Sequence, residues 1–260
     1  MAGADKLALI TGGVEPVGES IAKELVRRNW AVALQGPPGD ALAAAAERLN
    51  AVAEWTDQVA AFGAELTVGK EREQLIEMVL EEFGRIDLLV AAPAGPSIRQ
   101  DLLELIQDHY EHVQAAYVTA PLFLAQLVSN EMVRLTDSGA IEAAKIVFVN
   151  SLGAYTTFTD RPAHCLASAA TGMLTRLFAD ALSEHGVKVY EIRAGLISTR
   201  GDDDIHARYG QLIEAGLTPI RRWGRPQDVA LAVAAIAEDL LPYSTGEVIN
   251  VDGGFHLRRL

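Results

Sequence analysis

The sequence predicts an α/β fold in which one parallel β-sheet is covered by helices on both faces. Short apolar runs of strand length, beginning with Leu7–Ile10, alternate along the 260 residues with longer segments of helical period. Strands that are apolar along most of their length are typical of parallel sheets buried on both sides. No repeat, low-complexity linker or break in composition interrupts this alternation. We therefore expect residues 1–260 to form a single doubly wound domain of the Rossmann type.

In the first half of the chain the apolar runs and helical periods follow one another in a regular order. The predicted elements are a strand over Leu7–Ile10, a helix over Glu19–Asn29, a strand over Ala31–Leu34, an alanine-rich helix capped by Asp40, a strand between Phe62 and Val68, a helix over Arg72–Phe83 and a strand over Ile86–Ala91. Four apolar residues between Ile21 and Val26 share one helical face. The strand between Phe62 and Val68 has the weakest signal.

The second half continues the same alternation. Its predicted elements are a long helix over Gln107–Met132, a strand over Lys145–Val149, a helix over Ala163–Glu184 and strands over Val187–Ile192 and Val248–Val251. The long helix contains Leu122, Leu124, Leu127 and Val128, which fit either the core or a helix interface between subunits.

The amino-acid composition of the chain argues against several classes of binding partner. The chain has 22 basic and 35 acidic side chains and a net charge of −13, which argues against nucleic acid as the main partner. A single cysteine, Cys165, excludes an internal disulfide and suits a reducing cytoplasm. No apolar run approaches the roughly 18 residues that span a bilayer, and no signal peptide is visible. We expect a cytoplasmic protein without a membrane partner.

Five segments at a characteristic spacing point to one protein family. They are Thr11-Gly12-Gly13 with Gly18, Phe83–Asp87, Ser151 after the fifth strand, Gly224–Ala230, and Thr245-Gly246 leading to Val251–Gly254. With these segments the chain resembles the short-chain dehydrogenase/reductase family over essentially its whole length. The resemblance implies hydride transfer between a nicotinamide cofactor and a small carbonyl or alcohol. The tail over residues 252–258 is also similar to that of the pteridine-reductase branch.

The resemblance implies a catalytic site with unusual residues. Family members use Ser, Tyr and Lys, the last two four residues apart on a helix, and an Asn on the long helix. Ser151 is retained, but the family spacing places His164 at the Tyr position and Ser168 at the Lys position. Tyr117 stands at the Asn position. An imidazole exchanges a proton near neutral pH without a lysine to adjust it. A Ser-His site therefore replaces the Ser-Tyr-Lys set.

The resemblance also implies a site for NAD or NADP. The positions that would contact it are Gly12, Val14, Val17, Gly18, Ala92, Gly95, Gly195, Ile197 and Thr199. Pro16 replaces the middle glycine of the phosphate-binding turn and removes one N–H, although proline suits a first helical position. Glu15 would repel a 2′-phosphate, while the ribose-binding Asp of NAD-dependent members falls near Gly36. The sequence therefore indicates no preference between NAD and NADP.

Three functions remain open at this point. The first is an oxidoreductase that uses Ser151 and His164. The second is an inactive family member that senses a ligand or binds a partner, and the third is non-redox chemistry in an emptied cofactor pocket. The family also implies a small-molecule substrate, a homodimer or homotetramer, and a substrate lid over residues 201–219.

Several other side chains have simpler explanations. Tyr155 has a hydroxyl that can reach the pocket, although an aromatic residue there also serves packing. Cys165 adjoins His164, but neighbouring residues on a helix point about 100° apart and do not pair naturally. The acidic run over residues 202–204 is typical of a solvated loop, and no spacing of His or Cys predicts a metal site.

Overall fold

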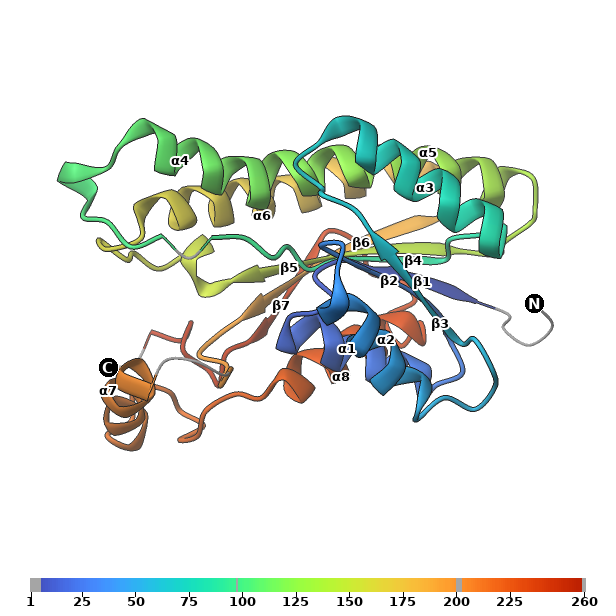
Figure 1. Ribbon diagram of the computed structural model, residues 1–260. Coiled ribbons are helices and arrows are strands. Elements are labelled where there is room, and N and C mark those ends of the chain that lie inside the picture. The colour runs from blue at the N-terminus through green and yellow to red at the C-terminus, as the bar shows by residue number, and fades with distance from the viewer. Residues whose placement is uncertain (1–5, 97, 200–202, 259–260) are drawn as a thin grey trace.

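The computed structural model describes residues 6–96, 98–199 and 203–258, and all their named strands belong to one sheet. Seven strands pair in parallel in the order β3-β2-β1-β4-β5-β6-β7 (Figure 1). Their bounds are β1 Leu7–Ile10, β2 Ala31–Gly36, β3 Val59–Gly63, β4 Leu88–Ala91, β5 Ala144–Ser151, β6 Val187–Ala194 and β7 Glu247–Val251. The strand order reverses between β1 and β4, which is where doubly wound folds bind ligands.

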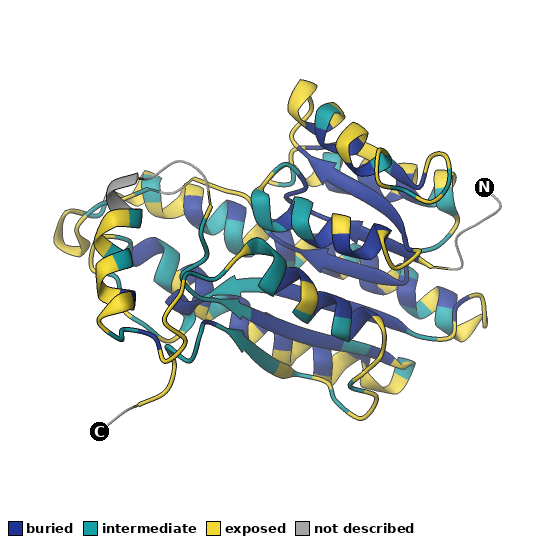
Figure 2. Cartoon of the chain, turned by 90° about the horizontal axis from the view of Figure 1, so that it is seen from below, coloured by how far each residue is buried: buried dark blue, intermediate teal, exposed yellow. Residues whose placement is uncertain are grey.

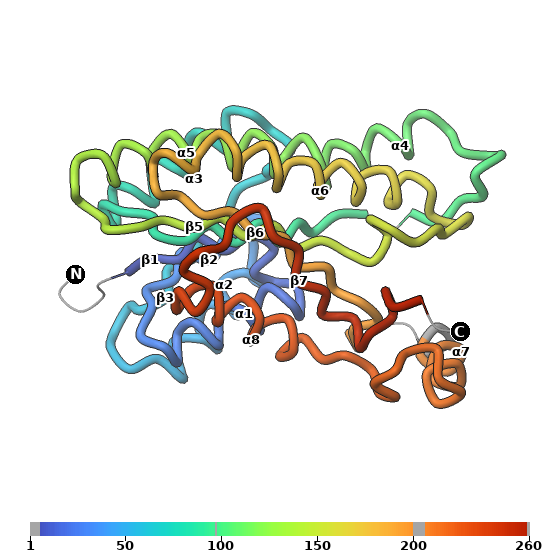
Figure 3. Tube along the Cα trace, turned by 180° about the vertical axis from the view of Figure 1, so that it is seen from behind, coloured from blue at the N-terminus to red at the C-terminus, as the bar shows by residue number. Residues whose placement is uncertain are grey.

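Helices cover the sheet in two layers (Figures 1 and 3). One face carries α3 (Gly69–Phe83), α4 (Gln107–Gln114), α5 (Ala120–Asp137) and α6 (Pro162–Leu182). The other face carries α1 (Pro16–Val26), α2 (Asp40–Asn50) and α8 (Pro226–Ala237). The remaining helix, α7 (Asp203–Glu214), lies apart from both layers, near the C-terminal end of the described chain. The predicted α/β class with helices on both faces is confirmed.

The core follows from this layering. Residues of β1, β2 and β4 are buried throughout (Figure 2). Two apolar clusters lie on opposite faces of the sheet. Leu124 and Val128 are fully buried in the cluster beneath α5, while Leu122 and Leu127 pack partly against it. Of the described residues, no helix is both long and apolar enough to cross a membrane.

Several predicted boundaries were wrong. The helix α3 begins at Gly69, three residues before the predicted start at Arg72. The third strand runs over Val59–Gly63 and not between Phe62 and Val68, because its ladder with β2 starts where Val59 pairs with Val32. Asn50 also exchanges two hydrogen bonds with the backbone of Val59. Asp40 is not a cap but the first residue of α2, since Gly39 is the N-cap and no side chain caps this helix. The first helix spans Pro16–Val26, three residues earlier than predicted.

The predicted helix over Gln107–Met132 is interrupted by a wider, π-helical turn over Ala115–Thr119. Within it the N–H of Ala120 bonds to the carbonyl of Ala115, five residues back. Pro121 has no N–H to offer the carbonyl of Tyr117, four residues back. The hydroxyl of Thr171 on α6 lies 3.2 Å from that carbonyl oxygen and 3.1 Å from the carbonyl oxygen of Ala167, and its one proton serves these two acceptors. The proline and its neighbouring helix together explain the interruption, which sets the position of Tyr117.

Candidate active site

Ser151, His164 and Ser168 form one hydrogen-bonded cluster. Ser151 Oγ lies 3.0 Å from His164 Nε2 and 3.1 Å from Ser168 Oγ. The backbone N–H of Gly153 also donates to Ser151 Oγ, at 3.1 Å. The structure therefore brings together three of the four side chains that the sequence singled out for chemistry, around one serine hydroxyl.

Local structure explains how these side chains meet. Ser151 is the last residue of β5 and its hydroxyl caps the short turn η3 (Leu152–Ala154) by accepting the Gly153 N–H. His164 lies in the first turn of α6, which Pro162 begins, and Ser168 lies one turn further on. Residues four apart share a helix face. The face that carries both side chains is the one turned toward Ser151.

Tyr117 packs edge-on against the His164 ring, with ring centroids 5.1 Å apart. Its hydroxyl donates to the carbonyl of Gly95 at 3.0 Å and does not bond to Ser151 or His164. Burial and the carboxylate of Glu15 raise the pKa of the Tyr117 hydroxyl. Burial and the nearby Arg161 cation lower the pKa of His164. At neutral pH the site thus holds a neutral imidazole, which is a base, beside a protonated phenol.

These side chains line a cavity of about 320 Å³, here termed the catalytic cavity. Its walls also include Val17 and Gly18 from α1, and Ala92 and Gly95 after β4. Thr199 is the fifth predicted cofactor residue that lines this cavity. Five of the nine predicted cofactor positions therefore meet the same cavity as the predicted catalytic residues. Among the described lining residues Glu15 is the only carboxylate, and none is a lysine or arginine.

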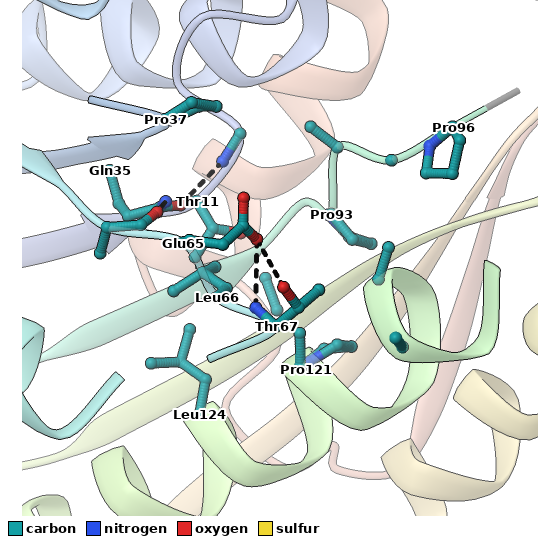
Figure 4. Close-up of a pocket in the computed structure, with 18 of the residues that line it drawn as sticks. Thr11, Gln35, Pro37, Glu65, Leu66, Thr67, Pro93, Pro96, Pro121 and Leu124 are labelled. Carbon is teal, nitrogen blue, oxygen red and sulfur yellow. Dashed lines mark hydrogen bonds between the residues drawn. The ribbon is translucent and has the colours of Figure 1, made fainter. Parts of the chain in front are cut away.

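A second cavity of about 340 Å³, here termed the distal cavity, lies on the other side of residues 93–95, which line both. Gly12, Gln35 and Pro37 form one part of its wall. Figure 4 shows Glu65 bonded to Thr67 across from Pro93. Two adjoining cavities at the carboxyl ends of β1 and β4 offer room for the two halves of an extended ligand.

The glycines of the first turn are required by close contacts of the backbone. A Cβ on Gly12 would lie 2.2 Å from the carbonyl oxygen of Ala92, and Gly12 has a φ of +63°. A Cβ on Gly18 would lie 2.2 Å from the carbonyl oxygen of Gly12. Pro16 is the first residue of α1, as its φ and missing N–H favour. The turn therefore keeps its path even though its middle glycine is replaced.

Three predicted cofactor positions line neither cavity. Val14 and Ile197 pack against the apolar cluster on the α1 and α8 face of the sheet. Gly195 donates its N–H to Val251, and a Cβ on it would lie 2.5 Å from the Cα of Asp252. Packing alone accounts for the residue type at these three positions.

A buried polar network behind Ser151 was missed by sequence reasoning. Asn150 donates to the carbonyl of Ser168 at 2.8 Å and to Glu191 at 2.7 Å, while its own oxygen accepts the N–H of Ser151. Glu191 is fully buried and forms a two-point ion pair with Arg193. The network ties β5 and β6 to α6 at the cluster. The charged residues Glu191 and Arg193, two apart on one strand face, were the signal that could have revealed it.

The remaining predicted side chains lie apart from the cluster. The hydroxyl of Tyr155 donates to Asp252 at 2.8 Å, and that bond together with burial raises the pKa of Tyr155. Cys165 is directed to the carbonyl of Thr156, at 3.6 Å, and forms no pair with His164. Asp202 lies outside the described residues, and no described group of three or more His, Cys, Asp or Glu could hold a metal. His206, in the segment predicted to form a substrate lid, stacks on Trp223.

Comparison with known proteins identifies the family. The family model described as "Enoyl-(Acyl carrier protein) reductase" matches residues 13–256. The structure of a short-chain type dehydrogenase/reductase from Mycobacterium ulcerans superposes with a TM-score of 0.90 at 27% identity, covering 100% of this chain and 92% of that one. The chain belongs to the short-chain dehydrogenase/reductase family.

Individual relatives of this family differ in the substrates that their names record. A 3-oxoacyl-[acyl-carrier protein] reductase from Brucella melitensis in complex with NAD has a TM-score of 0.90 at 30% identity, with 98% of both chains covered. A rhamnolipid-biosynthesis 3-oxoacyl-[acyl-carrier-protein] reductase from Pseudomonas aeruginosa is 29% identical over 257 residues, 98% of this chain and 97% of that protein. A 2-dehydro-3-deoxy-D-gluconate 5-dehydrogenase from Dickeya dadantii is 25% identical over 256 residues, 97% of this chain and 96% of that protein. These relatives are oxidoreductases, as the resemblance implied.

Proposed function

We propose that the chain is a nicotinamide-dependent oxidoreductase for a small carbonyl or alcohol, with Ser151 and His164 as its catalytic pair. The observation that carries this proposal is the 3.0 Å contact between Ser151 Oγ and His164 Nε2 on the wall of the catalytic cavity. It places a hydroxyl and a group that can take or give a proton side by side, where a substrate oxygen can reach both.

The first turn and the two cavities fit a dinucleotide. The N–H groups of Val17 and Gly18 belong to the first turn of α1, where backbone donors and the helix dipole favour a phosphate. Gly12 and Gly18 allow the turn its close backbone contacts, because a Cβ on either would meet a carbonyl oxygen at 2.2 Å. When bound, a nicotinamide cofactor supplies or accepts the hydride. Because Glu15 adds negative charge at this wall, we expect weak binding of either cofactor.

The side chains would divide the proton chemistry as follows. In alcohol oxidation, neutral His164 accepts the proton of the alcohol, and the Ser151 hydroxyl donates to the same oxygen. In carbonyl reduction, protonated His164 returns that proton to the oxygen. The lowered pKa of His164 keeps little of the protonated form at neutral pH. Oxidation is therefore the direction for which the site is already in the required protonation state.

Titration with NADH and NADPH, followed by turnover of a panel of alcohols and carbonyls, tests this proposal. The panel includes 3-oxoacyl thioesters and sugar acids, since the names of the relatives record both classes. We expect cofactor binding, turnover, and a loss of about 100-fold or more in turnover for His164→Gln with cofactor affinity unchanged. Absence of cofactor binding at millimolar concentration would remove the proposal.

A binding protein without turnover is the second candidate. The observation in its favour is that Ser168 is buried and supplies only a hydroxyl where family members place a lysine ammonium. Cofactor binding without conversion of any member of the panel would support this candidate over an enzyme. The predicted homodimer or homotetramer is compatible with either function, and analytical ultracentrifugation of the purified protein measures it.

A further inference from the structure

The contact between Ser151 and His164 has the form of a nucleophile and its general base. A serine hydroxyl becomes nucleophilic when an adjacent base lies within about 2.6–3.2 Å. Ser151 Oγ and His164 Nε2 meet this requirement at 3.0 Å. Neither residue is locked inside the core, because both line the catalytic cavity.

The hydrogen bonds around Ser151 direct its proton toward the imidazole. A hydroxyl has one proton and two lone pairs. The Gly153 N–H can only donate, so it occupies one lone pair of Ser151 Oγ. A neutral imidazole with its Nδ1 protonated can only accept at Nε2, so the Ser151 proton is then directed to His164. The Ser168 hydroxyl, 3.1 Å from Ser151 Oγ, becomes the second donor.

We propose that Ser151 is an acyl-accepting nucleophile and that the chain hydrolyses activated acyl esters through an acyl-Ser151 intermediate. This activity needs water and no nicotinamide cofactor. Ser151 Oγ forms a bond to the acyl carbon while its proton passes to His164 Nε2. The bond from the acyl carbon to the leaving oxygen then breaks, and that oxygen takes the proton from Nε2.

Hydrolysis of the acyl-enzyme repeats the step with water. Water forms a bond to the acyl carbon and gives a proton to His164 Nε2. The bond to Ser151 Oγ breaks, Oγ regains the proton, and the carboxylic acid leaves. The Ser168 hydroxyl, which can rotate from Oγ toward the carbonyl oxygen, supplies a donor for the charge that develops there.

The surroundings of His164 determine how fast we expect ester hydrolysis to be. Among the described residues no carboxylate is found against the His164 ring, whereas the third member of a catalytic triad normally orients the imidazole. We therefore expect slow turnover and accumulation of the acyl-enzyme. A covalent adduct on the protein is the appropriate readout.

The chain contains a matched control for this contact. His206 Nε2 lies 2.8 Å from Ser198 Oγ, so a second Ser-His pair has the same spacing. Its imidazole, however, stacks on the ring of Trp223 at a centroid distance of 4.1 Å, and neither residue lines the catalytic or the distal cavity. Both pairs bring a serine close to a histidine, but of the two only Ser151 and His164 line the catalytic cavity.

The experiment treats the purified full chain, without nicotinamide cofactor, with p-nitrophenyl acetate. Intact-mass and peptide-mapping spectrometry then locate any acetyl group. We expect one acetyl group on Ser151, none in Ser151→Ala, an acetylation rate lowered about 100-fold in His164→Gln, and full labelling in Ser198→Ala. Circular dichroism melting curves of each variant verify folding.

Three results would overturn the proposal. They are no acetyl group on Ser151 of the wild-type chain, acetylation of Ser198 or Cys165 in its place, and an unchanged rate in His164→Gln. Because no cofactor is present, failure here leaves the oxidoreductase proposal standing. Failure of the cofactor titration likewise leaves acyl transfer to Ser151 untouched.

Discussion

The turn after β1 and the start of α6 face the same catalytic cavity, but they are built in different ways. The turn presents backbone N–H groups, which exist whatever the side chains are, provided that Gly12 and Gly18 allow the close contacts. The start of α6 presents the side chains of His164 and Ser168. Under the proposed function, a substitution in the turn adjusts binding, whereas a substitution on α6 replaces the reacting groups.

The two regions also differ from the family pattern in different ways. Pro16 removes one N–H from the turn and still serves as the first residue of α1. At the start of α6 the phenol and the ammonium expected from the family are both replaced, and a new contact between His164 and Ser151 has formed. The backbone of the turn thus keeps Gly12 and Gly18, while the side chains at the start of α6 differ from those of the family.

The largest expected effect is on stability, when a side chain is added in the turn where the backbone packs closely. In Gly18→Ala the new Cβ would meet the Gly12 carbonyl at 2.2 Å, where neither backbone can yield. We expect a loss of about 3 kcal/mol in the free energy of unfolding, measured by urea denaturation. Gly69→Ala is the control, because its Cβ meets only the end of the Arg72 side chain at 3.5 Å. A change below about 1 kcal/mol is expected there. An equal loss in both variants would contradict the close-contact explanation.

A smaller effect is expected when the missing N–H of the turn is restored. Pro16→Ala returns one donor to the first turn of α1, and a hydrogen bond to a charged group contributes about 1.5–3 kcal/mol. NADH affinity should rise about tenfold or more by fluorescence titration. The matched substitution Pro226→Ala at the start of α8, which lines neither cavity, should leave the affinity unchanged. No gain in Pro16→Ala would show that this N–H does not face the phosphates.

The smallest expected effect concerns the start of α6 and acid stability. Burial and Arg161 lower the pKa of His164 in the folded chain below its ordinary value. The unfolded chain therefore binds the proton first as the pH falls, and His164 makes the fold less stable below about pH 6.5. In His164→Gln the loss in urea midpoint between pH 7.5 and pH 5.5 should be smaller than in the wild-type chain. A larger or equal loss would place the acid sensitivity elsewhere.

The sequence predicted the members of the site better than their contacts. Family spacing selected Ser151, His164 and Ser168, and the structure brings these three together. It also selected Tyr117, whose hydroxyl bonds to Gly95 because the π-helical turn determines its direction. Pro121 marks a break in the helical pattern of the sequence, but the contact from Thr171 of another helix cannot be read locally.

The buried network behind the site was unpredicted for a related reason. Asn150 and Glu191 come from different strands and meet α6 only after the sheet has assembled. The spacing of Glu191 and Arg193 two residues apart in one strand is visible in the sequence, but the amide of Asn150 on the neighbouring strand is not. Such satisfaction of buried polar groups depends on tertiary contacts.

The amino-acid sequence by itself determined the parallel sheet, the layering of helices and the replacement of a phenol by an imidazole. These properties follow from apolar periodicity and from residue identity at each position, which need no knowledge of distant contacts. Only the tertiary structure decided that the His164 ring is turned toward Ser151, that it is buried enough to be a neutral base, and that both line a cavity. Orientation, desolvation and access depend on which elements pack together, and packing joins residues that the sequence keeps apart.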